Sequence, residues 1–281
     1  MSIVLSKYQG TGNDYLILDP NRNEVTMQQR KVEMICRRNF GVGSDGILYG
    51  PVKRDGKIFL KIYNPDGSEA ERSGNGIRIF AKYLLDRGYV KAEKFSLSLS
   101  MGGEVEVSFL NEDGTDIEVN MGRVDFASEH IPVTGPEREV INEPMMFHDH
   151  FYNVTCLAVG NPHCVIMMED VNGELARELG PYVERDSHFP NRMNMQLLKV
   201  VDRENICIEI YERGTGYTLA SGSSACAAAA AAYRMGLTER NVTVHMPGGA
   251  LRIRVEEDYS IHMRGSVGYI GEIILAEDFF A

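Results

Sequence analysis

Two serines at the start of glycine-led turns have the type and spacing to do chemistry. Ser73 and Ser221 each precede a glycine and open a run with a helical pattern. Serine is a favoured helix N-cap, because its hydroxyl accepts a hydrogen bond from the exposed amides of the first turn. A helix N-terminus also attracts anions through unpaired amides and its dipole, and glycine lets a ligand approach the backbone. Singly, each serine fits an N-cap; the pair predicts a site for a carboxylate.

Further polar residues stand in turns that are similar in the two halves of the chain. Asn13 and Asn161 each follow a glycine, and Asn64 and Glu212 each follow a strand-like run. Asparagine in a turn usually bonds nearby backbone, but matched positions in two halves also suit contacts with a polar substrate. Arg213 suits bidentate capture of a carboxylate, with an exposed ion pair to Glu212 as the structural alternative.

The elements that must position these residues repeat along the chain. Landmarks of the first half recur in the second at one constant offset: Gly12-Asn13 with Gly160-Asn161, Ile62-Tyr63 with Ile210-Tyr211, Ser73-Gly74 with Ser221-Gly222, and Gly88 with Gly236. The period is far longer than that of a solenoid repeat. We therefore predict a domain duplication, in which the two serine turns could face each other across a cleft.

Each half has the order strand, glycine-rich turn, helix and short strands. The runs Ile58–Tyr63 and Ile206–Tyr211 alternate as half-buried strands do. Helices are predicted at roughly Gly74–Arg87 and Gly222–Met235, each ended by a glycine. The second helix is nearly all alanine and small residues, so we expect it to be enclosed on every side. The sequence thus predicts an α+β fold of two pseudo-symmetric domains, each a curved, mostly antiparallel sheet wrapped around a central helix.

The domain boundary is expected within Gly122–Arg138, where prolines and a glycine interrupt the pattern. We assign residues 1–124 to the N-terminal domain and residues 125–271 to the C-terminal domain. The last segment, 272–281, could complete the N-terminal sheet. A chain of 281 residues suits two domains of ordinary size.

Composition and charge exclude several classes of partner. The formal charge of −11 argues against nucleic acid or an anionic membrane surface. No apolar run approaches the ~20 residues that span a bilayer, and residues 1–10 carry no secretory pattern. The 5 cysteines show no disulfide or metal-ligand spacing, so we expect a reducing cytoplasm and no metal. His148-Asp149-His150 is expected to be an exposed loop.

The two serine turns and their surroundings resemble the signatures of diaminopimelate epimerases. The first signature is matched by Asn64–Glu69 and Ser73–Arg78, and the second by Glu212–Thr218, Ala220–Gly222 and Ala225–Ala227. Other segments match in order along the chain, namely Gly10–Tyr15, Gly41–Gly46, Gly160–His163, Phe189–Asn194 and Pro247–Gly249. The resemblance covers essentially the whole chain and is more specific for the fold and family than for the substrate.

This resemblance implies an isomerase of lysine biosynthesis that inverts an amino-acid α-carbon without pyridoxal phosphate, metal or another cofactor. One cysteine of the family removes the α-proton and a second, on the opposite face, delivers another. By motif these carriers fall on Ser73 and Ser221, with His163 beside them and Glu212 as a further carboxylate that could move a proton. The remaining residues implied to bind substrate are Asn13, Asn64, Gly74, Asn75, Asn161, Asn194, Arg213, Gly222 and Ser223.

Serine at both carrier positions departs from the family pattern. A thiol of pKa ~8.5 needs about 2 kcal/mol to ionise at pH ~7, whereas a hydroxyl as weakly acidic as water needs on the order of 12 kcal/mol. Oriented amides lower this cost without removing it. Another base is therefore expected to take part, and the candidates are Asp66, Glu69, His163 and Glu212.

Three explanations of the serines stay open. They could be engineered replacements in an inactive epimerase, or belong to a natural relative that acts as a different amino-acid racemase or dehydratase. The chain could also bind an amino acid without catalysis. Ile79 and Ser223-Ser224 replace a further cysteine and a Thr/Ser-Gly pair usual in the family, which favours a natural relative. In each case the expected partner is a small amino acid, and a homodimer is compatible with the sequence.

Overall fold

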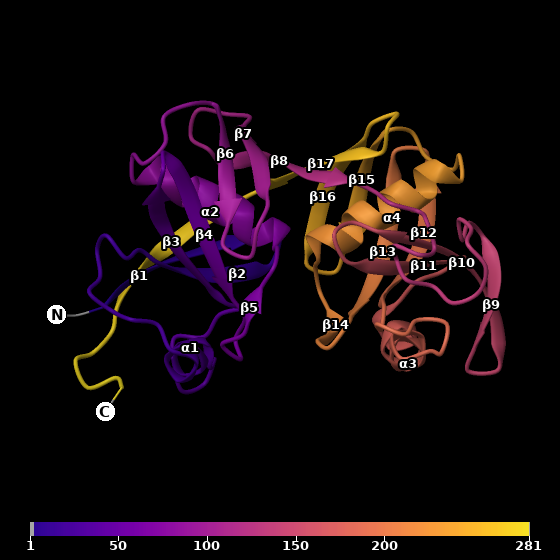
Figure 1. Ribbon diagram of the computed structural model, residues 1–281, viewed down its shortest axis with the longest axis horizontal. Helices are drawn as coiled ribbons and strands as arrows, with labels where there is room; N and C mark the ends of the chain where they lie inside the picture. The colour runs from indigo at the N-terminus through magenta and orange to yellow at the C-terminus, as the bar shows by residue number, and fades with distance from the viewer. Residues whose placement is uncertain (1–2, 281) are drawn as a thin grey trace. The chain divides into compact units, whose positions relative to one another are not determined.

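The computed structural model describes residues 3–280, which divide into two compact units (Figure 1). The N-terminal unit runs to Val119 and resumes at Gly265, and the C-terminal unit spans Asn120–Arg264. The division lies a few residues before the boundary that we placed after residue 124.

The N-terminal unit is a sheet that carries two helices. Its helices are α1 (Gln29–Cys36) and α2 (Gly74–Asp86), and its strands are β1 (Val4–Gly10), β2 (Asn13–Leu18), β3 (Ile47–Arg54), β4 (Lys57–Tyr63), β5 (Glu69–Ala70), β6 (Lys94–Leu99), β7 (Glu104–Phe109), β8 (Asp116–Arg123) and β18 (Gly268–Ile274). Strand pairing gives the order β18-β1-β2-β3-β4-β6-β7-β8, with β5 as a second partner of β4. Only β2–β3 and β4–β6 are parallel in this order.

The C-terminal unit is built in the same way. Its helices are α3 (Gly173–Glu184) and α4 (Gly222–Arg234), and its strands are β9 (Glu143–Phe147), β10 (His150–Ala158), β11 (Pro162–Met167), β12 (Asn194–Asp202), β13 (Asn205–Glu212), β14 (Gly216–Thr218), β15 (Asn241–Met246), β16 (Gly249–Val255) and β17 (Ser260–Ser266). The order is β9-β10-β11-β12-β13-β15-β16-β17, with β14 beside β13. The parallel pairs β11–β12 and β13–β15 occupy the same places as those of the first sheet.

The two units therefore have one topology, strand for strand. The segment that takes the place of β9 in the N-terminal unit is β18, which pairs with β1 over most of its length. This pairing explains why the chain returns to the N-terminal unit at Gly265, earlier than the segment 272–281 that the sequence suggested. The predicted α+β fold with mostly antiparallel sheets is confirmed.

Helix α4 is enclosed, as its composition predicts. The side chains of Ala225–Ala232 have no exposed surface, and the helix contacts β10, β11, β12, β13, β15 and β16. Alanine has the highest helix propensity, and its small side chain lets strands approach on all sides. The helix is followed by Gly236 at a φ of 73°, a conformation that glycine adopts without strain.

Helix α2 is also buried on every side from Gly74 to Leu84, but with larger and partly polar side chains. Ile77, Phe80, Ala81 and Leu84 have the spacing of one helix face and are fully buried. The helix contacts β1, β2 and β3. Both central helices thus fix their N-terminal turns, and with them the two serines, against a sheet.

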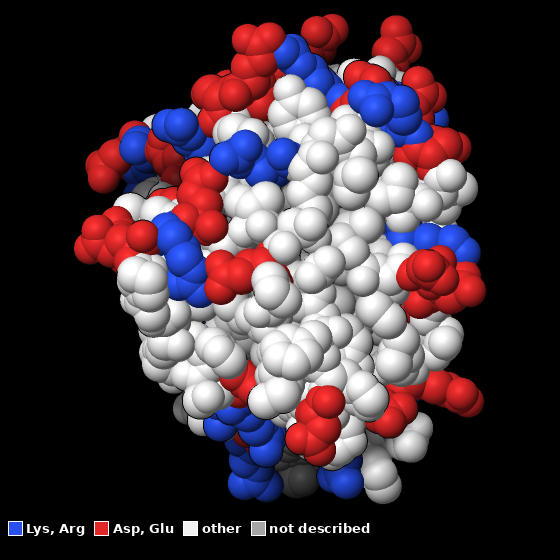
Figure 2. Space-filling model, turned by 90° about the vertical axis from the view of Figure 1, so that its right-hand side faces the viewer, with Lys and Arg blue, Asp and Glu red and all other residues white. Residues whose placement is uncertain are grey.

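Few surface features outside these turns suggest a function. Within residues 3–280, no helix is long and apolar enough to cross a membrane, and no cluster of three His, Cys, Asp or Glu side chains could hold a metal ion. His148 and Asp149 form the exposed turn between β9 and β10. The side of the C-terminal unit in Figure 2 is broadly uncharged with charged residues at its margin, and Met146, Phe151 and Tyr182 are among the exposed apolar side chains of this unit.

Candidate active site

Ser73 is the N-cap of α2, as the sequence predicts. Its Oγ accepts a hydrogen bond from the backbone N–H of Gly76 at 3.0 Å and lies 3.1 Å from the phenol oxygen of Tyr15. Its backbone is extended, which turns the chain into the helix at the buried residues Gly74 and Asn75. The hydroxyl is therefore held at the positive end of a helix, beside amides that suit a carboxylate.

The side chain of Asn75 is oriented by a buried arginine. Arg78 has no exposed surface, and its guanidinium donates to Oδ1 of Asn75 at 2.8 Å and to Oγ1 of Thr11 at 3.2 Å. Asn75 in turn donates through Nδ2 to Oδ1 of Asn13 at 3.3 Å. A guanidinium only donates, so it fixes which end of the Asn75 amide faces Asn13.

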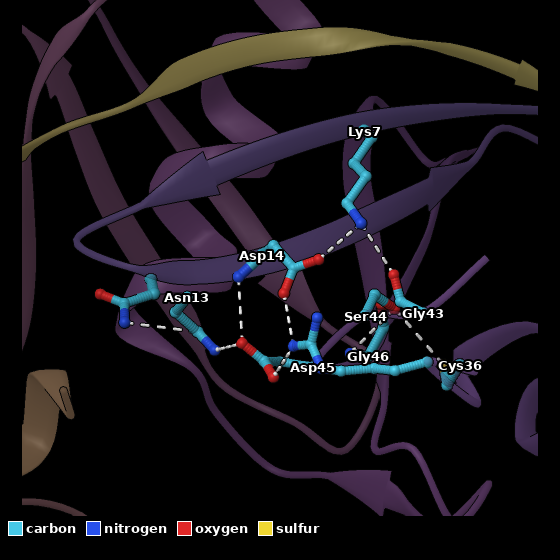
Figure 3. Close-up of polar contacts among 10 residues, drawn as sticks. Lys7, Asn13, Asp14, Cys36, Gly43, Ser44, Asp45 and Gly46 are labelled. Carbon is cyan, nitrogen blue, oxygen red and sulfur yellow. Dashed lines mark hydrogen bonds and ion pairs between the residues drawn. The ribbon is translucent and has the colours of Figure 1, made fainter. Parts of the chain in front are cut away.

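Asn13 is also held from the other side by a network of charges (Figure 3). Its Nδ2 donates to Asp45 at 2.5 Å, and Asp45 also accepts from the backbone N–H of Asp14 at 3.0 Å. Arg38 bridges the carboxylates of Asp14 and Asp45 at 2.7 and 2.6 Å, and Lys7 pairs with Asp14 at 2.8 Å. Burial raises the pKa of Asp14, but the hydrogen bonds from Arg38 and Lys7 outweigh it and leave that pKa low.

Asn64 lies in a separate turn after β4. Its Nδ2 donates to Oγ of Ser68 at 3.0 Å, and Ser68 donates to Asp66 at 2.6 Å. The hydroxyl and backbone N–H of Ser68 hold the pKa of the exposed Asp66 below its usual range. Nearby Glu69 pairs with Lys61 at 2.9 Å. Its burial raises the pKa of Glu69, but hydrogen bonds from Ser100 and Lys61 lower it on balance.

Ser221 caps α4 in the same way as Ser73 caps α2. Its Oγ accepts from the backbone N–H of Ser224 at 3.4 Å and lies 3.4 Å from Oγ of Ser223. Ser221 and Gly222 are buried, and Ser223 is half-buried. The second serine turn therefore also presents a hydroxyl at a helix N-terminus.

Glu212, at the end of β13, is the ionisable group beside Ser221. Burial raises the pKa of its carboxyl group, and the hydroxyls of Ser221 and Thr218 beside it act in the opposite direction without cancelling the shift. A carboxylate with a raised pKa is a stronger base than an ordinary glutamate. The arrangement can thus accept a proton at, or through, the Ser221 hydroxyl.

His163, on β11, is fully buried and stays neutral at ordinary pH. Burial lowers its pKa to about 3, and the positive charge of Arg213 is a smaller contribution in the same direction. Its Nε2 lies 2.9 Å from Oδ1 of Asn161, and a hydrogen bond with Gln196 raises its pKa by less than burial lowers it. A neutral imidazole with so low a pKa is a weak base, but it fixes the amide of Asn161.

The turn that carries Arg213 is tied down through its backbone. Asn194 accepts from the N–H of Arg213 at 3.0 Å, and the buried carboxylate of Glu184 accepts from the N–H of Gly214 at 2.9 Å. The exposed guanidinium of Arg213 donates to the carbonyl of Asn191 at 3.0 Å. Arg213 is therefore held by the side chain of Asn194 and the backbone carbonyl of Asn191, at the same turn as Glu212.

The structure groups the residues of the N-terminal unit around Ser73, Gly74, Asn75 and Asn13, and leaves Asn64 in its own turn. In the C-terminal unit it places Glu212 with Ser221, Asn161 with His163, and Asn194 with Arg213. Sequence reasoning did not single out Tyr15 and Thr218, which contact these residues. The period of two along a strand, which puts Tyr15 on the same face as Asn13, was the one signal for Tyr15.

Comparison of the sequence with known proteins relates the chain to diaminopimelate epimerases. The family model described as Diaminopimelate epimerase matches residues 5–127 and 155–270. The chain is 48% identical to Diaminopimelate epimerase 2 of Nostoc sp. over 98% of this chain and 96% of that protein. It is 36% identical to Diaminopimelate epimerase 1 of the same organism, over 94% of this chain and 96% of that protein.

Solved structures show the same fold at low sequence identity. A hydroxyproline epimerase from Agrobacterium vitis superposes with a TM-score of 0.68 at 11% identity, covering 99% of this chain and 93% of that chain. A phenazine biosynthesis protein of the PhzF family from Bacillus anthracis superposes with a TM-score of 0.66 at 15% identity, covering 98% and 99%. On the family match and the full-length relatives together, the chain belongs to the diaminopimelate epimerase family and is a cofactor-independent amino-acid epimerase, an isomerase.

Proposed function

We propose that the chain inverts the α-carbon of diaminopimelate, in lysine biosynthesis, with Ser73 and Ser221 at the two positions where the family carries cysteine thiols. The observation that carries this proposal is the pair of matching N-caps, each with its hydroxyl at the start of a buried helix. Full-length similarity to two Nostoc diaminopimelate epimerases makes diaminopimelate the first substrate to test.

Glu212 is the best base among the four candidates that the sequence left open. Asp66 is exposed, and its low pKa makes it a poor base. Glu69 is engaged by Lys61 and Ser100, which also keep its pKa low. His163 has a pKa of about 3. Glu212 alone combines a raised pKa with a position beside one of the serines.

A concerted transfer of two protons then avoids ionising the weakly acidic serine hydroxyl. As the Cα–H bond breaks, the proton moves to Oγ of Ser221 while the hydroxyl proton of Ser221 moves to the Glu212 carboxylate. The electron pair stays on the substrate as a carbanion delocalised into its carboxylate. No free alkoxide forms, so the ionisation cost of on the order of 12 kcal/mol does not arise. Amides at the helix starts would stabilise the negative charge on the substrate carboxylate.

Chiral chromatography of each diaminopimelate stereoisomer after incubation with the purified protein tests this function. We expect conversion between epimers without added cofactor. Olefinic or keto products would indicate a dehydratase. Measurable binding of an amino acid without conversion would indicate a binding protein, and conversion of a different amino acid would indicate another racemase.

A cytoplasmic location and a homodimer remain predictions from the sequence. Sedimentation velocity of the purified chain at several concentrations checks the assembly. A species of twice the chain mass of 31.4 kDa is expected, and a monomer at all concentrations would contradict it.

A further inference from the structure

The hydroxyl of Ser73 has a phenol as its side-chain neighbour, whereas the hydroxyl of Ser221 has a carboxyl group. Tyr15 Oη lies 3.1 Å from Ser73 Oγ, within hydrogen-bond distance, and either oxygen can be the donor. The backbone N–H of Gly76 donates to Ser73 Oγ and occupies one of its lone pairs. The hydroxyl proton of Ser73 is not used in that bond, so Ser73 can also act as a donor. The two units therefore offer different ionisable partners to their serines.

The ring of Tyr15 is fixed by the fold and is not a mobile surface group. Tyr15 lies in β2 opposite Tyr8 of β1, and it is only 7% exposed. The chain at Gly46 passes so close that a Cβ there would lie 2.8 Å from Cε1 of Tyr15, a separation that real Cβ atoms do not show. Glycine at this position makes room for the ring, which can then reach Ser73.

A phenol is far better suited than an aliphatic hydroxyl to exchange a proton. Its ordinary pKa of about 10 lies nearly six units below the ~15.7 of a water-like hydroxyl. A proton can therefore pass from Tyr15 to Ser73 at a much smaller cost than the ionisation of Ser73 alone. The helix N-terminus beside Ser73 also stabilises negative charge that develops there.

We propose that Tyr15 is the proton-relay partner of Ser73, which replenishes the serine hydroxyl while Ser73 delivers its proton to the α-carbon. The Ser73 O–H bond breaks as the new Cα–H bond forms, and the Tyr15 O–H bond breaks as a new Ser73 O–H bond forms. The electron pair of the Tyr15 O–H bond stays on the phenolate, and water returns the proton after turnover. In the reverse direction the phenolate accepts the proton.

This role of Tyr15 rests on the proposed function and assigns each serine its own proton-transfer partner. The carboxyl group of Glu212 exchanges a proton with Ser221, and the phenol of Tyr15 exchanges a proton with Ser73. Loss of one partner should then stop inversion while leaving the exchange of α-protons through the other serine intact. A structural role for Tyr15 would impair exchange and inversion alike.

The test is Tyr15→Phe, which keeps the ring and removes only the hydroxyl. Inversion is measured by chiral chromatography and α-proton exchange by NMR in deuterated water, starting from each epimer. We expect inversion to fall at least about 100-fold. Exchange without inversion should persist for the epimer from which Ser221 removes the proton. Tyr89→Phe is the matched control, because its hydroxyl donates to Asp19 at 2.7 Å, and it should invert at the wild-type rate.

Two results would overturn the relay. One is inversion by Tyr15→Phe at the wild-type rate, and the other is an equal loss of exchange and inversion from both epimers. Wild-type protein that neither exchanges nor inverts diaminopimelate would contradict the proposed function itself, and the relay with it. A wild-type protein that inverts while Tyr15→Phe is unaffected would leave the function standing and remove only the relay.

Discussion

The side chain of Asn194 joins the start of β11 to the turn after β13 through its amide. Its Oδ1 accepts from the backbone N–H of Arg213 at 3.0 Å, and its Nδ2 donates to the carbonyl of Pro162 at 2.7 Å. Asn194 and His163 are register partners on β12 and β11, so the amide lies beside His163 as well. Asn194 thus holds in place the turn that carries Glu212 and Arg213.

Asn194→Ala should cost both stability and activity. The substitution leaves the buried carbonyl of Pro162 and the part-buried N–H of Arg213 without their partner, which costs about 1–3 kcal/mol, mostly from the buried carbonyl. Activity should fall because the turn with Glu212 loosens. Denaturant unfolding measures the first effect. Asn191→Ala is the matched control, since it keeps the backbone carbonyl that accepts from Arg213, and it should stay within about 0.5 kcal/mol of wild type. Equal stability of both variants would contradict this role of Asn194.

Glu212→Gln should lose inversion, and it should lack the part of the stability that the wild type loses as the pH rises above the ordinary glutamate pKa. Removal of the base lowers the rate by about 100-fold or more. Burial raises the pKa of Glu212, so the folded state favours the protonated form. The wild type therefore loses stability as the pH rises from the ordinary glutamate pKa through the raised one, and glutamine does not titrate. Glu209→Gln on the same strand is the control. Inversion by Glu212→Gln at the wild-type rate would exclude it as the base.

His163 predicts a pH dependence of stability in the opposite direction. Its pKa is about 3 in the folded protein and about 6.5 when unfolded, so the unfolded state binds the extra proton as pH falls through this window. The wild type should lose about 2 kcal/mol from this group between pH 7 and pH 5. Denaturant unfolding at both values should show a smaller loss for His163→Gln. The same loss in both proteins, with exposed His130→Gln as control, would contradict the neutral histidine.

Thiols at both serine positions should increase the rate of inversion. A thiol ionises at pH ~7 for about 2 kcal/mol, so the Ser73→Cys, Ser221→Cys double variant needs no relay. We expect it to invert diaminopimelate at least about 10-fold faster than wild type, with each single variant between the two. A well-folded double variant no faster than wild type would show that the hydroxyls are not what limits the reaction, and would favour a different substrate.

The local structure around the two serines could be predicted from the sequence. The two N-caps, the helices that follow and the glycines that end them depend on neighbouring residues, so Ser73 and Ser221 were predicted at the positions where the structure places them. The enclosure of α4 followed from its alanines. The repetition of these sequence features in both halves also indicated that the two halves share one fold.

Contacts between segments far apart in the chain could not be predicted from the sequence. The return of the chain at Gly265 depends on pairing of β18 with β1, and the contact of Tyr15 with Ser73 depends on where β2 lies in its sheet. The burial of Arg78 runs against the usual exposure of arginine. Choosing Glu212 among four possible bases required its burial and its neighbour, which no sequence pattern supplies.

The most direct test of the central claim is the fate of the α-proton during inversion by the wild-type protein. Stereochemically pure diaminopimelate is incubated with the protein in deuterated water, and the inverted product is analysed by NMR and mass spectrometry. Proton removal and return through the serine turns predicts one solvent deuterium at the inverted α-carbon. Inverted product that retains its original proton, or no inversion and no deuterium, would contradict the account.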